Sequence, residues 1–287
     1  MASINRIVMM SGADYFSDEF AINPFMDSSV PIDIEKAQAD HAHIQGCLEQ
    51  AGVKVIQIAP PKDCQDGVYA ANWALCRRGK AVLARLPDIR QTEMAHAEKV
   101  LKEQGLKIIR LPEGMHFSGQ GDALPCGNYL FMGQGYRTDP AAHRLVGEAL
   151  DYEVISLQTV PALDHKGQPR INSITGWPDS FFYDLDLALA VLTKNLIAWC
   201  PEAFLPDSQA KIRGLPLEKI EVSLDEALHG FACNLVSTGE TVVMSAHAPL
   251  FKAAVEARGL QTITPEVDEL SKGGGFIRCT SLTLDND

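Results

Sequence analysis

A glycine-rich segment near the end of the sequence delivers a single cysteine to a short alternating segment, residues 276–284. Gly273, Gly274 and Gly275 allow the backbone to approach a ligand closely, and Cys279 follows them. A thiol that combines access with the rigid support of a strand is suited to nucleophilic attack. The alternative is a turn before a buried, inert cysteine, because free cysteines commonly pack as small hydrophobic residues. The other polar residues of the chain must decide between these interpretations.

Four other segments open in the same way as the cysteine segment, with a polar residue directly before an apolar run. These polar residues are Asn72, Asp122, Asp186 and Asn234. Taken singly, Asp and Asn before a strand are ordinary turn formers. Their recurrence, with Cys279 as the fifth case, predicts that all five face one cavity. Because an unmet buried polar group costs roughly 1 to 3 kcal/mol, such a cavity suggests a polar ligand.

The elements that would position these residues repeat along the chain as hairpin, helix and strand. The hairpins are expected to begin near residues 69, 121, 182, 231 and 276. Helices are expected at 33–50, 91–104, 140–150 and 248–258, and strands at 6–10, 53–58, 106–111, 152–157 and 260–263. The fifth unit is split between the two ends of the chain. Five such units predict a closed ring of the α/β class, forming one domain over residues 1–287.

Composition narrows the range of partners. The chain has 287 residues, of which 46% are apolar and 22% charged, and its net charge is −12. We find no cluster of basic residues with interleaved aromatics, so neither nucleic acid nor an anionic membrane surface is expected as a partner. An acidic protein can attract a small cationic substrate. The sequence leaves the oligomeric state open, with a homo-oligomer among the options.

The cysteine and histidine patterns favour neither disulfides nor a metal centre. The seven cysteines are widely spaced and form no CxxC pair, and the eight histidines include no HExxH motif. We therefore expect no metal and no cofactor, and a reducing cytoplasm fits best. His41 and His43 lie two apart in a helical pattern, which predicts a solvated pair. The sequence shows no leader peptide and no apolar run of about 18 residues.

At these residues the chain resembles the guanidine-modifying superfamily, which has the pentein or α/β-propeller fold. The superfamily includes arginine deiminases, amidinotransferases and dimethylarginine dimethylaminohydrolases, and the arginine dihydrolase type is the most similar. The resemblance implies a fold of five ββαβ units around a central cavity. It covers nearly the whole chain and rests on the segments 14–16, 21–26, 66–72, 119–124, 135–139, 182–186, 231–234 and 273–279.

The resemblance implies a catalytic role for four residues. Cys279 matches the nucleophile, while Asp122 and Asp186 match carboxylates that hold the guanidinium or orient the site. Asp184 stands where the family pattern has its catalytic histidine. His116 is the alternative candidate for the missing histidine, because it lies two residues before Ser118.

The resemblance also implies a set of substrate contacts. Asn23 and Asn72 match amides that contact the substrate, and Arg90 and Arg137 match arginines that clamp its α-carboxylate. Two further positions are expected to contribute: Asp66, which belongs to the same motif as Asn72, and Ser118, which stands where the family has a glutamate.

The implied reaction is hydrolysis of a C–N bond in an arginine-like guanidino or ureido compound through an S-amidine on Cys279. Asp184 would then carry the proton, with a pKa raised above the usual ~3.9 by neighbouring carboxylates and burial. The alternatives are an amidinotransferase, or a member that binds an arginine-like ligand or a partner without turnover. Asn72 favours two hydrolytic rounds. The identity of the substrate stays open.

Overall fold

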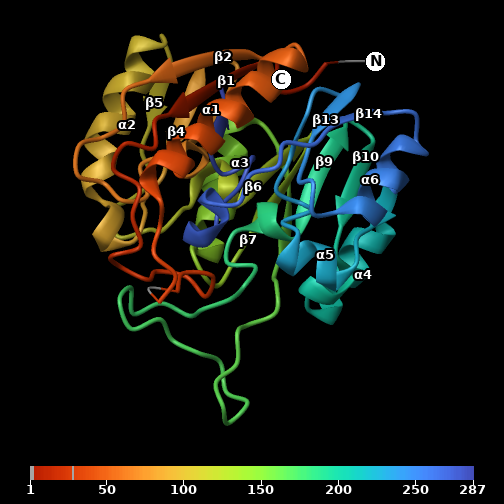
Figure 1. The fold of residues 1–287 in the computed structure, drawn as a ribbon. Coiled ribbons are helices and arrows are strands. Elements are labelled where there is room, and N and C mark those ends of the chain that lie inside the picture. Colours follow the sequence, from red (N-terminus) through yellow and green to blue (C-terminus); the bar gives the residue numbers. More distant parts are fainter. Residues whose placement is uncertain (1–2, 28) are drawn as a thin grey trace.

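Five three-stranded sheets surround a common axis in the computed structural model, which describes residues 3–27 and 29–287 (Figure 1). In every sheet the middle strand pairs antiparallel with one neighbour and parallel with the other. In spatial order the sheets are β15 (Ser281–Thr283), β1 (Ile7–Ser11) and β2 (Lys54–Ile58); β3 (Ala74–Arg77), β4 (Lys80–Leu83) and β5 (Lys107–Ile109); β6 (Ala123–Cys126), β7 (Tyr129–Gly133) and β8 (Glu153–Leu157); β9 (Leu189–Thr193), β10 (Leu196–Trp199) and β11 (Glu218–Glu221); and β12 (Val236–Ser237), β13 (Thr241–Val243) and β14 (Gln261–Ile263).

One helix in each unit connects the middle strand to the parallel outer strand, and these helices lie on the outside of the ring (Figure 1). Asp33 caps the first of them, because its side chain accepts a hydrogen bond from the backbone N–H of Lys36. Three others begin with a proline, whose fixed φ suits the first turn of a helix. The five are α1 (Ile34–Gln50), α2 (Thr92–Glu103), α3 (Pro140–Leu150), α4 (Pro206–Gly214) and α6 (Pro249–Glu256); a short α5 (Leu224–His229) connects β11 to β12.

The ring closes where the two ends of the chain share a sheet. Met9 of β1 pairs with Leu282 of β15, as the split fifth unit predicts. The backbone N–H of Thr283 then donates to Oε1 of Gln120, which precedes β6, at 2.8 Å. This bond ties the last strand to another unit near the axis. The five-unit α/β fold predicted from the sequence is therefore confirmed.

The segments that enter the hairpins differ from the expected strands. One turn of 3₁₀ helix precedes three of the hairpins: η1 (Ala70–Trp73), η3 (Gly119–Gly121) and η4 (Leu185–Leu187). In the last unit only Ser281–Thr283 is a strand, so the strand predicted over 276–284 is wrong in its first half. An extended chain points alternate side chains to opposite faces. A tight turn instead lets neighbouring polar residues converge on the axis.

The prediction of a solvated histidine pair is wrong for His41. His43 is exposed, whereas His41 is buried together with Ala37, Ile44 and Leu48 of α1. These four positions recur every three or four residues, so His41 belongs to the face that packs on the sheet. Burial lowers the pKa of its imidazole to about 4, against a smaller opposing effect of Asp14.

A long segment between β8 and η4 extends away from the ring (green in Figure 1). Its Asn172 side chain donates to the backbone oxygen of Ala21 at 3.0 Å, which connects it to the loop after β1. Arg170 and Asp179 form an ion pair of 2.8 Å across it. Among the helices that the structure describes, none is both long and apolar enough to cross a membrane.

Candidate active site

The thiol of Cys279 lies against a carboxylate and an amide on the axis of the ring. Its Sγ is 3.4 Å from Oδ2 of Asp186 and accepts a hydrogen bond from Nδ2 of Asn234 at 3.1 Å. Oδ1 of Asn234 accepts from the backbone N–H groups of Arg278 and Cys279, at 2.9 and 3.2 Å. Asn234 therefore fixes both the thiol and the turn that carries it.

A second carboxylate, Asp184, is held by the amide of Asn72. Nδ2 of Asn72 donates to Oδ2 of Asp184 at 2.7 Å and to the oxygens of Ser118 at 3.0 and 3.1 Å. Hydrogen bonds from Asn72 and Ser118 favour the ionised form of the Asp184 carboxyl. The sequence thus brought together three of its predicted site residues at this point.

The third carboxylate, Asp122, is packed against β7. Its Oδ1 accepts the backbone N–H of Leu185, the neighbour of Asp184, at 3.1 Å. A Cβ at Gly133 would lie 1.8 Å from the same oxygen, so only glycine leaves room for this side chain. Asp122 is thereby fixed close to Asp184 and Asp186, and the negative charges of these two raise its pKa further than burial does alone.

Two carboxylate oxygens in this cluster have no hydrogen-bond partner. They are Oδ1 of Asp184 and Oδ1 of Asp186, and both residues are at most 1% exposed. Burial raises the pKa of both carboxyl groups, and for Asp186 the charge of Asp184 raises it further. Burial likewise raises the pKa of the Cys279 thiol, to which both carboxylates add. A cation placed among these groups would offset all three effects.

The two arginines predicted to clamp a carboxylate have different surroundings. Arg137 donates from Nη2 to the backbone oxygen of Ile22 at 2.8 Å, and its guanidinium carbon lies 4.6 Å from the centre of the Tyr183 ring. Arg90 is bonded through Nε and Nη2 to both oxygens of Glu93, at 2.7 and 2.8 Å.

The fourth contact of Arg90 is with the site itself. Its Nη1 donates to Oδ1 of Asn72 at 3.1 Å, and its Nη2 also donates to the backbone oxygen of Asp66 at 3.1 Å. Burial opposes the charge of Arg90, but the carboxylate of Glu93 raises its pKa above the ordinary value. With these donors in use, Arg90 is placed to orient Asn72.

The remaining predicted residues lie at the edges of the cluster. Nδ2 of Asn23 donates to the backbone oxygen of Gly273 at 2.9 Å, which joins the loop after β1 to the glycine segment. Asp66 is 1% exposed and accepts from Nε2 of Gln65 at 2.9 Å. Burial raises the pKa of Asp66 to about 6, against the opposing charge of Arg90. All ten predicted site residues are buried in the structure.

The glycine segment is held against two buried tyrosines. The hydroxyl of Tyr69 donates to the backbone oxygen of Leu270 at 2.6 Å, and that of Tyr183 donates to the oxygen of Gly274 at 2.7 Å. A Cβ at Gly275 would lie 2.5 Å from the Tyr69 ring and 2.9 Å from Cβ of Cys279. The absence of side chains here allows the ring, the loop and the thiol to meet.

Several residues of the site were not among the predicted ones. Asn234 was noted only as a strand opener, although its position in the repeat equals those of Asn72 and Asp186. Glu93 and Tyr183 carry no motif signal, since their roles depend on distant partners. His116 is half-buried, with its ring 4.2 Å from that of Trp177 and its Nδ1 3.8 Å from Asp139.

The sequence and the fold were compared with known proteins. A family model described as N,N dimethylarginine dimethylhydrolase, eukaryotic, matches residues 13–284. The N(G),N(G)-dimethylarginine dimethylaminohydrolase of Mycobacterium tuberculosis is 33% identical over 282 residues, covering 97% of this chain and 86% of the relative. The bifunctional arginine dihydrolase/ornithine cyclodeaminase AgrE of Nostoc sp. is 28% identical over 96% of this chain, which spans 37% of that protein.

Solved structures agree with the sequence matches. The N-terminal domain of ArgZ, a cyanobacterial arginine dihydrolase crystallised with its product, superposes with a TM-score of 0.85 at 25% identity, covering 97% of this chain and 98% of that domain. The dimethylarginine dimethylaminohydrolase of Pseudomonas aeruginosa superposes with a TM-score of 0.77 at 19% identity, covering 97% and 99%, and so shares the fold. The chain therefore belongs to the N,N-dimethylarginine dimethylhydrolase family, within the pentein superfamily that also contains the arginine dihydrolases.

Proposed function

We propose that this protein is a hydrolase that cleaves a C–N bond of an arginine-like guanidino compound, with Cys279 as the nucleophile. One observation carries the proposal: the thiol lies 3.4 Å from Asp186 in a buried cluster whose two free carboxylate oxygens, on Asp184 and Asp186, lack partners. A guanidinium is a planar cation with several N–H donors, and it would satisfy both oxygens at once. The same charge would lower the pKa of the thiol and favour the thiolate.

The chemistry follows from this placement. The thiolate adds to the guanidino carbon, which the carboxylates hold in position, and a tetrahedral species forms. A proton passes to one nitrogen, the C–N bond breaks, and an amine leaves an S-amidine on Cys279. Water then adds to the amidine carbon, gives up a proton, and the C–S bond breaks to release a ureido product and the thiol.

We assign the proton transfers to Asp184, which stands where the family pattern has a histidine. A carboxyl group with an ordinary pKa is almost fully ionised at neutral pH and is a poor acid. Burial raises the pKa of Asp184, while Arg137 and the hydrogen bonds from Ser118 and Asn72 oppose this rise. These opposing effects would place the group where it can both give and accept a proton.

The substrate class is argued from the residues around the thiol and from the relatives. Arg137 offers a buried guanidinium to an α-carboxylate, while Arg90 is engaged by Glu93 and holds Asn72. The relatives' names identify dimethylarginine and arginine as substrates of those proteins. We propose L-arginine as the first compound to test, because Asn72 is the feature that the dihydrolase-like members share, and N(G),N(G)-dimethylarginine as the second.

The test is intact-protein mass spectrometry with ammonia and dimethylamine assays. The wild-type protein with arginine or dimethylarginine should release amine and show a transient adduct, which peptide mapping places on Cys279. Cys279→Ser should bind the same compound in calorimetry and release no amine. An adduct on any other cysteine, or equal release by Cys279→Ser, would contradict the proposal.

The role of Asp184 is tested separately. Asp184→Asn keeps the shape of the side chain but removes its proton-carrying capacity, so we expect kcat to fall roughly 100-fold or more. Asp151→Asn, at a carboxylate that is 86% exposed, is the matched control and should not change kcat. An Asp184→Asn variant as active as wild type would remove Asp184 from the mechanism.

A second function, binding without turnover, is favoured by one observation. The Cys279 thiol is flanked by two carboxylates that keep its pKa high, and its neighbour Asp184 replaces a base that the family pattern contains. Calorimetric binding of arginine to the wild-type protein, with no adduct and no product after prolonged incubation, would select this second function.

A further inference from the structure

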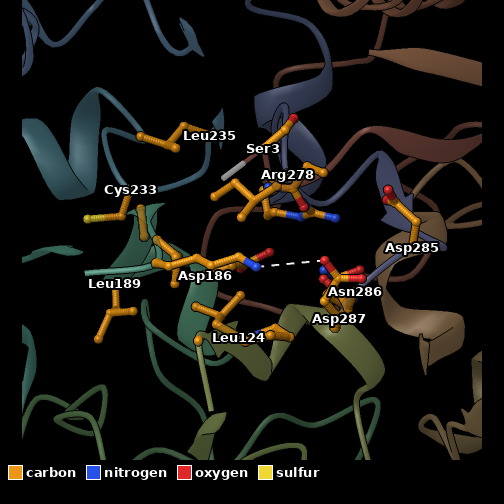
Figure 2. Close-up of a pocket in the computed structure, with 18 residues that line it drawn as sticks. Ser3, Leu124, Asp186, Leu189, Cys233, Leu235, Arg278, Asp285, Asn286 and Asp287 are labelled. Atoms are coloured by element: carbon orange, nitrogen blue, oxygen red, sulfur yellow. Dashed lines mark hydrogen bonds and ion pairs between the residues drawn. The ribbon is translucent and has the colours of Figure 1, made fainter. Parts of the chain in front are cut away.

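A small pocket reaches the catalytic cluster from the side of the ring opposite to the glycine segment. Its inner wall includes Asp186 and Arg278, and its rim includes Lys194 and Asp287 (Figure 2). The rim is open, because the side chains of Lys194 and Asp287 are 41% and 64% exposed. We call this the axial pocket. Its volume is about 60 Å³, enough for a few water molecules at roughly 10 to 15 Å³ each and far too small for an amino acid.

Arg278 is the buried cation at the inner end of the axial pocket. Its side chain is 5% exposed. Nη1 donates to Oδ1 of Asn5 at 3.3 Å, and Nη2 donates to Oγ1 of Thr283 at 3.1 Å and to the backbone oxygen of Ser281. All of these acceptors are neutral. Nε has no partner in the described structure.

This arrangement is unusual for a guanidinium. Among the residues that the structure describes, no carboxylate oxygen lies within 4.0 Å of Arg278 to form an ion pair. Burying an unpaired charge costs several kcal/mol. By contrast, the other buried arginine of the site, Arg90, has a bidentate partner in Glu93. Stability alone therefore does not account for Arg278.

The position of Arg278 next to the nucleophile offers a reason. Its backbone N–H and that of Cys279 donate to the same oxygen of Asn234, so the two residues form one rigid turn. Its guanidinium shares the axial pocket with Asp186, whose carboxylate contacts the thiol. The cation thus lies behind the thiol and the carboxylate, on the side that the substrate does not occupy.

We propose that Arg278 is a positioning residue that stabilises the negative charge on Sγ of Cys279 and on Asp186 through space from the axial pocket. The inference rests on the proposed function, which requires that charge to form on sulfur. Its electrostatic effect is independent of turnover. The charge of Arg278 lowers the pKa of Asp186, while Asp186 and Cys279 together oppose the burial that lowers the pKa of Arg278 to about 10.

Other groups also face the thiol and must stay constant in a test. They are the carboxylates of Asp184 and Asp186 and the phenols of Tyr69 and Tyr183, and the nearest of the other cations, Arg90 and Arg137, interact with Asp184. A substitution at Arg278 leaves all of these in place. The change in thiol reactivity can therefore be attributed to the one charge removed.

The test measures the rate at which iodoacetamide alkylates Cys279 at several pH values, with the modified peptide identified by mass spectrometry. Arg278→Met removes the charge and should lower the rate at pH 8 about tenfold, which corresponds to a rise of about one unit in the thiol pKa. Arg278→Lys keeps the charge and should restore the rate to within about threefold of wild type. Lys194→Met removes a cation from the rim of the same pocket and should change nothing.

The outcomes separate this inference from the proposed function. Wild-type alkylation rates in a folded Arg278→Met variant, or equal losses in the Met and Lys variants, would overturn it, whatever the activity of the protein. Should Arg278→Met fail to fold by near-ultraviolet circular dichroism, Thr283→Val is the second variant. It frees Nη2 from one anchor while keeping the charge, and should lower the rate at least about threefold; an unchanged rate there would also overturn the inference.

Discussion

Nη1 of Arg90 donates to Oδ1 of Asn72 at 3.1 Å, and this contact fixes which end of the amide faces Asp184. A guanidinium can only donate, so the amide oxygen must face Arg90 and the amide NH₂ must face the carboxylate. The NH₂ group then donates to Asp184 at 2.7 Å. The orientation of Asn72 therefore depends on Arg90, and through it on Glu93.

The Arg90–Glu93 pair is predicted to be important for stability. The two side chains are 4% and 1% exposed, and Oε2 of Glu93 also accepts from Nε1 of Trp73 at 2.8 Å. In Glu93→Gln the new NH₂ group would face these donors, and the charge of Arg90 would be left unpaired. We expect a loss of about 3 to 5 kcal/mol in the free energy of unfolding, measured by urea denaturation.

An exposed pair provides the control for this prediction. Arg144 and Glu148 of α3 are 71% and 61% exposed and form an ion pair of 2.9 Å. Glu148→Gln should change the free energy of unfolding by less than about 0.5 kcal/mol. Similar losses in the two variants would show that burial does not set the strength of the Arg90–Glu93 pair.

The fold could be predicted from the sequence because local patterns repeat. Apolar runs, turn residues and helical periodicity recur five times, and the two ends of the chain supply the halves of one unit. The convergence of Asn72, Asp122, Asp186 and Cys279 could be predicted as well, since each stands at the same point of its unit. Symmetry turned four sequence positions into one location.

What could not be predicted depends on contacts between distant residues. Glu93 is an ordinary helix residue in the sequence and becomes part of the site only because α2 brings it to Arg90. Burial of His41 follows from which face of α1 meets the sheet. The 3₁₀ turns before the hairpins carry no pattern of their own, because three or four residues are too few for a periodicity.

Gly275 is predicted to be required for activity rather than for backbone conformation. It is not among the glycines with positive φ, so an alanine there meets only a steric obstacle. Its Cβ would lie 2.5 Å from Cε1 of Tyr69 and 2.9 Å from Cβ of Cys279. Gly275→Ala should displace the thiol from Asp186, and because a misplacement of ~1 Å can cost about 100-fold, we expect kcat to fall by that order.

Gly46, in the middle of α1, is the matched glycine for this comparison. A Cβ there would meet nothing within 4 Å. Gly46→Ala should leave kcat unchanged and raise the free energy of unfolding by roughly 0.5 to 1 kcal/mol, because alanine is the better helix former. Full activity in Gly275→Ala would mean that the tyrosine ring can move aside without moving the thiol.

The buried imidazole of His41 predicts a specific loss of stability in acid. Its pKa is about 4 in the folded protein and about 6.5 when unfolded. Between these values the unfolded chain binds a proton that the folded protein does not. Stability is therefore complete above pH 6.5 and is lost as the pH falls towards 4. For this 2.5-unit difference the loss by pH 4.5 is roughly 2 to 3 kcal/mol.

His41→Gln removes this titration while keeping a polar side chain of similar reach, and His43→Gln on the exposed face of the same helix serves as the control. The free energy of unfolding should be measured in urea at pH 7.5 and pH 4.5. The wild-type protein and His43→Gln should lose roughly 2 to 3 kcal/mol more than His41→Gln between these two pH values, because every other titrating group is common to all three proteins. Equal losses in the three would mean that His41 becomes protonated without unfolding, with Asp14 as the carboxylate that accommodates its charge.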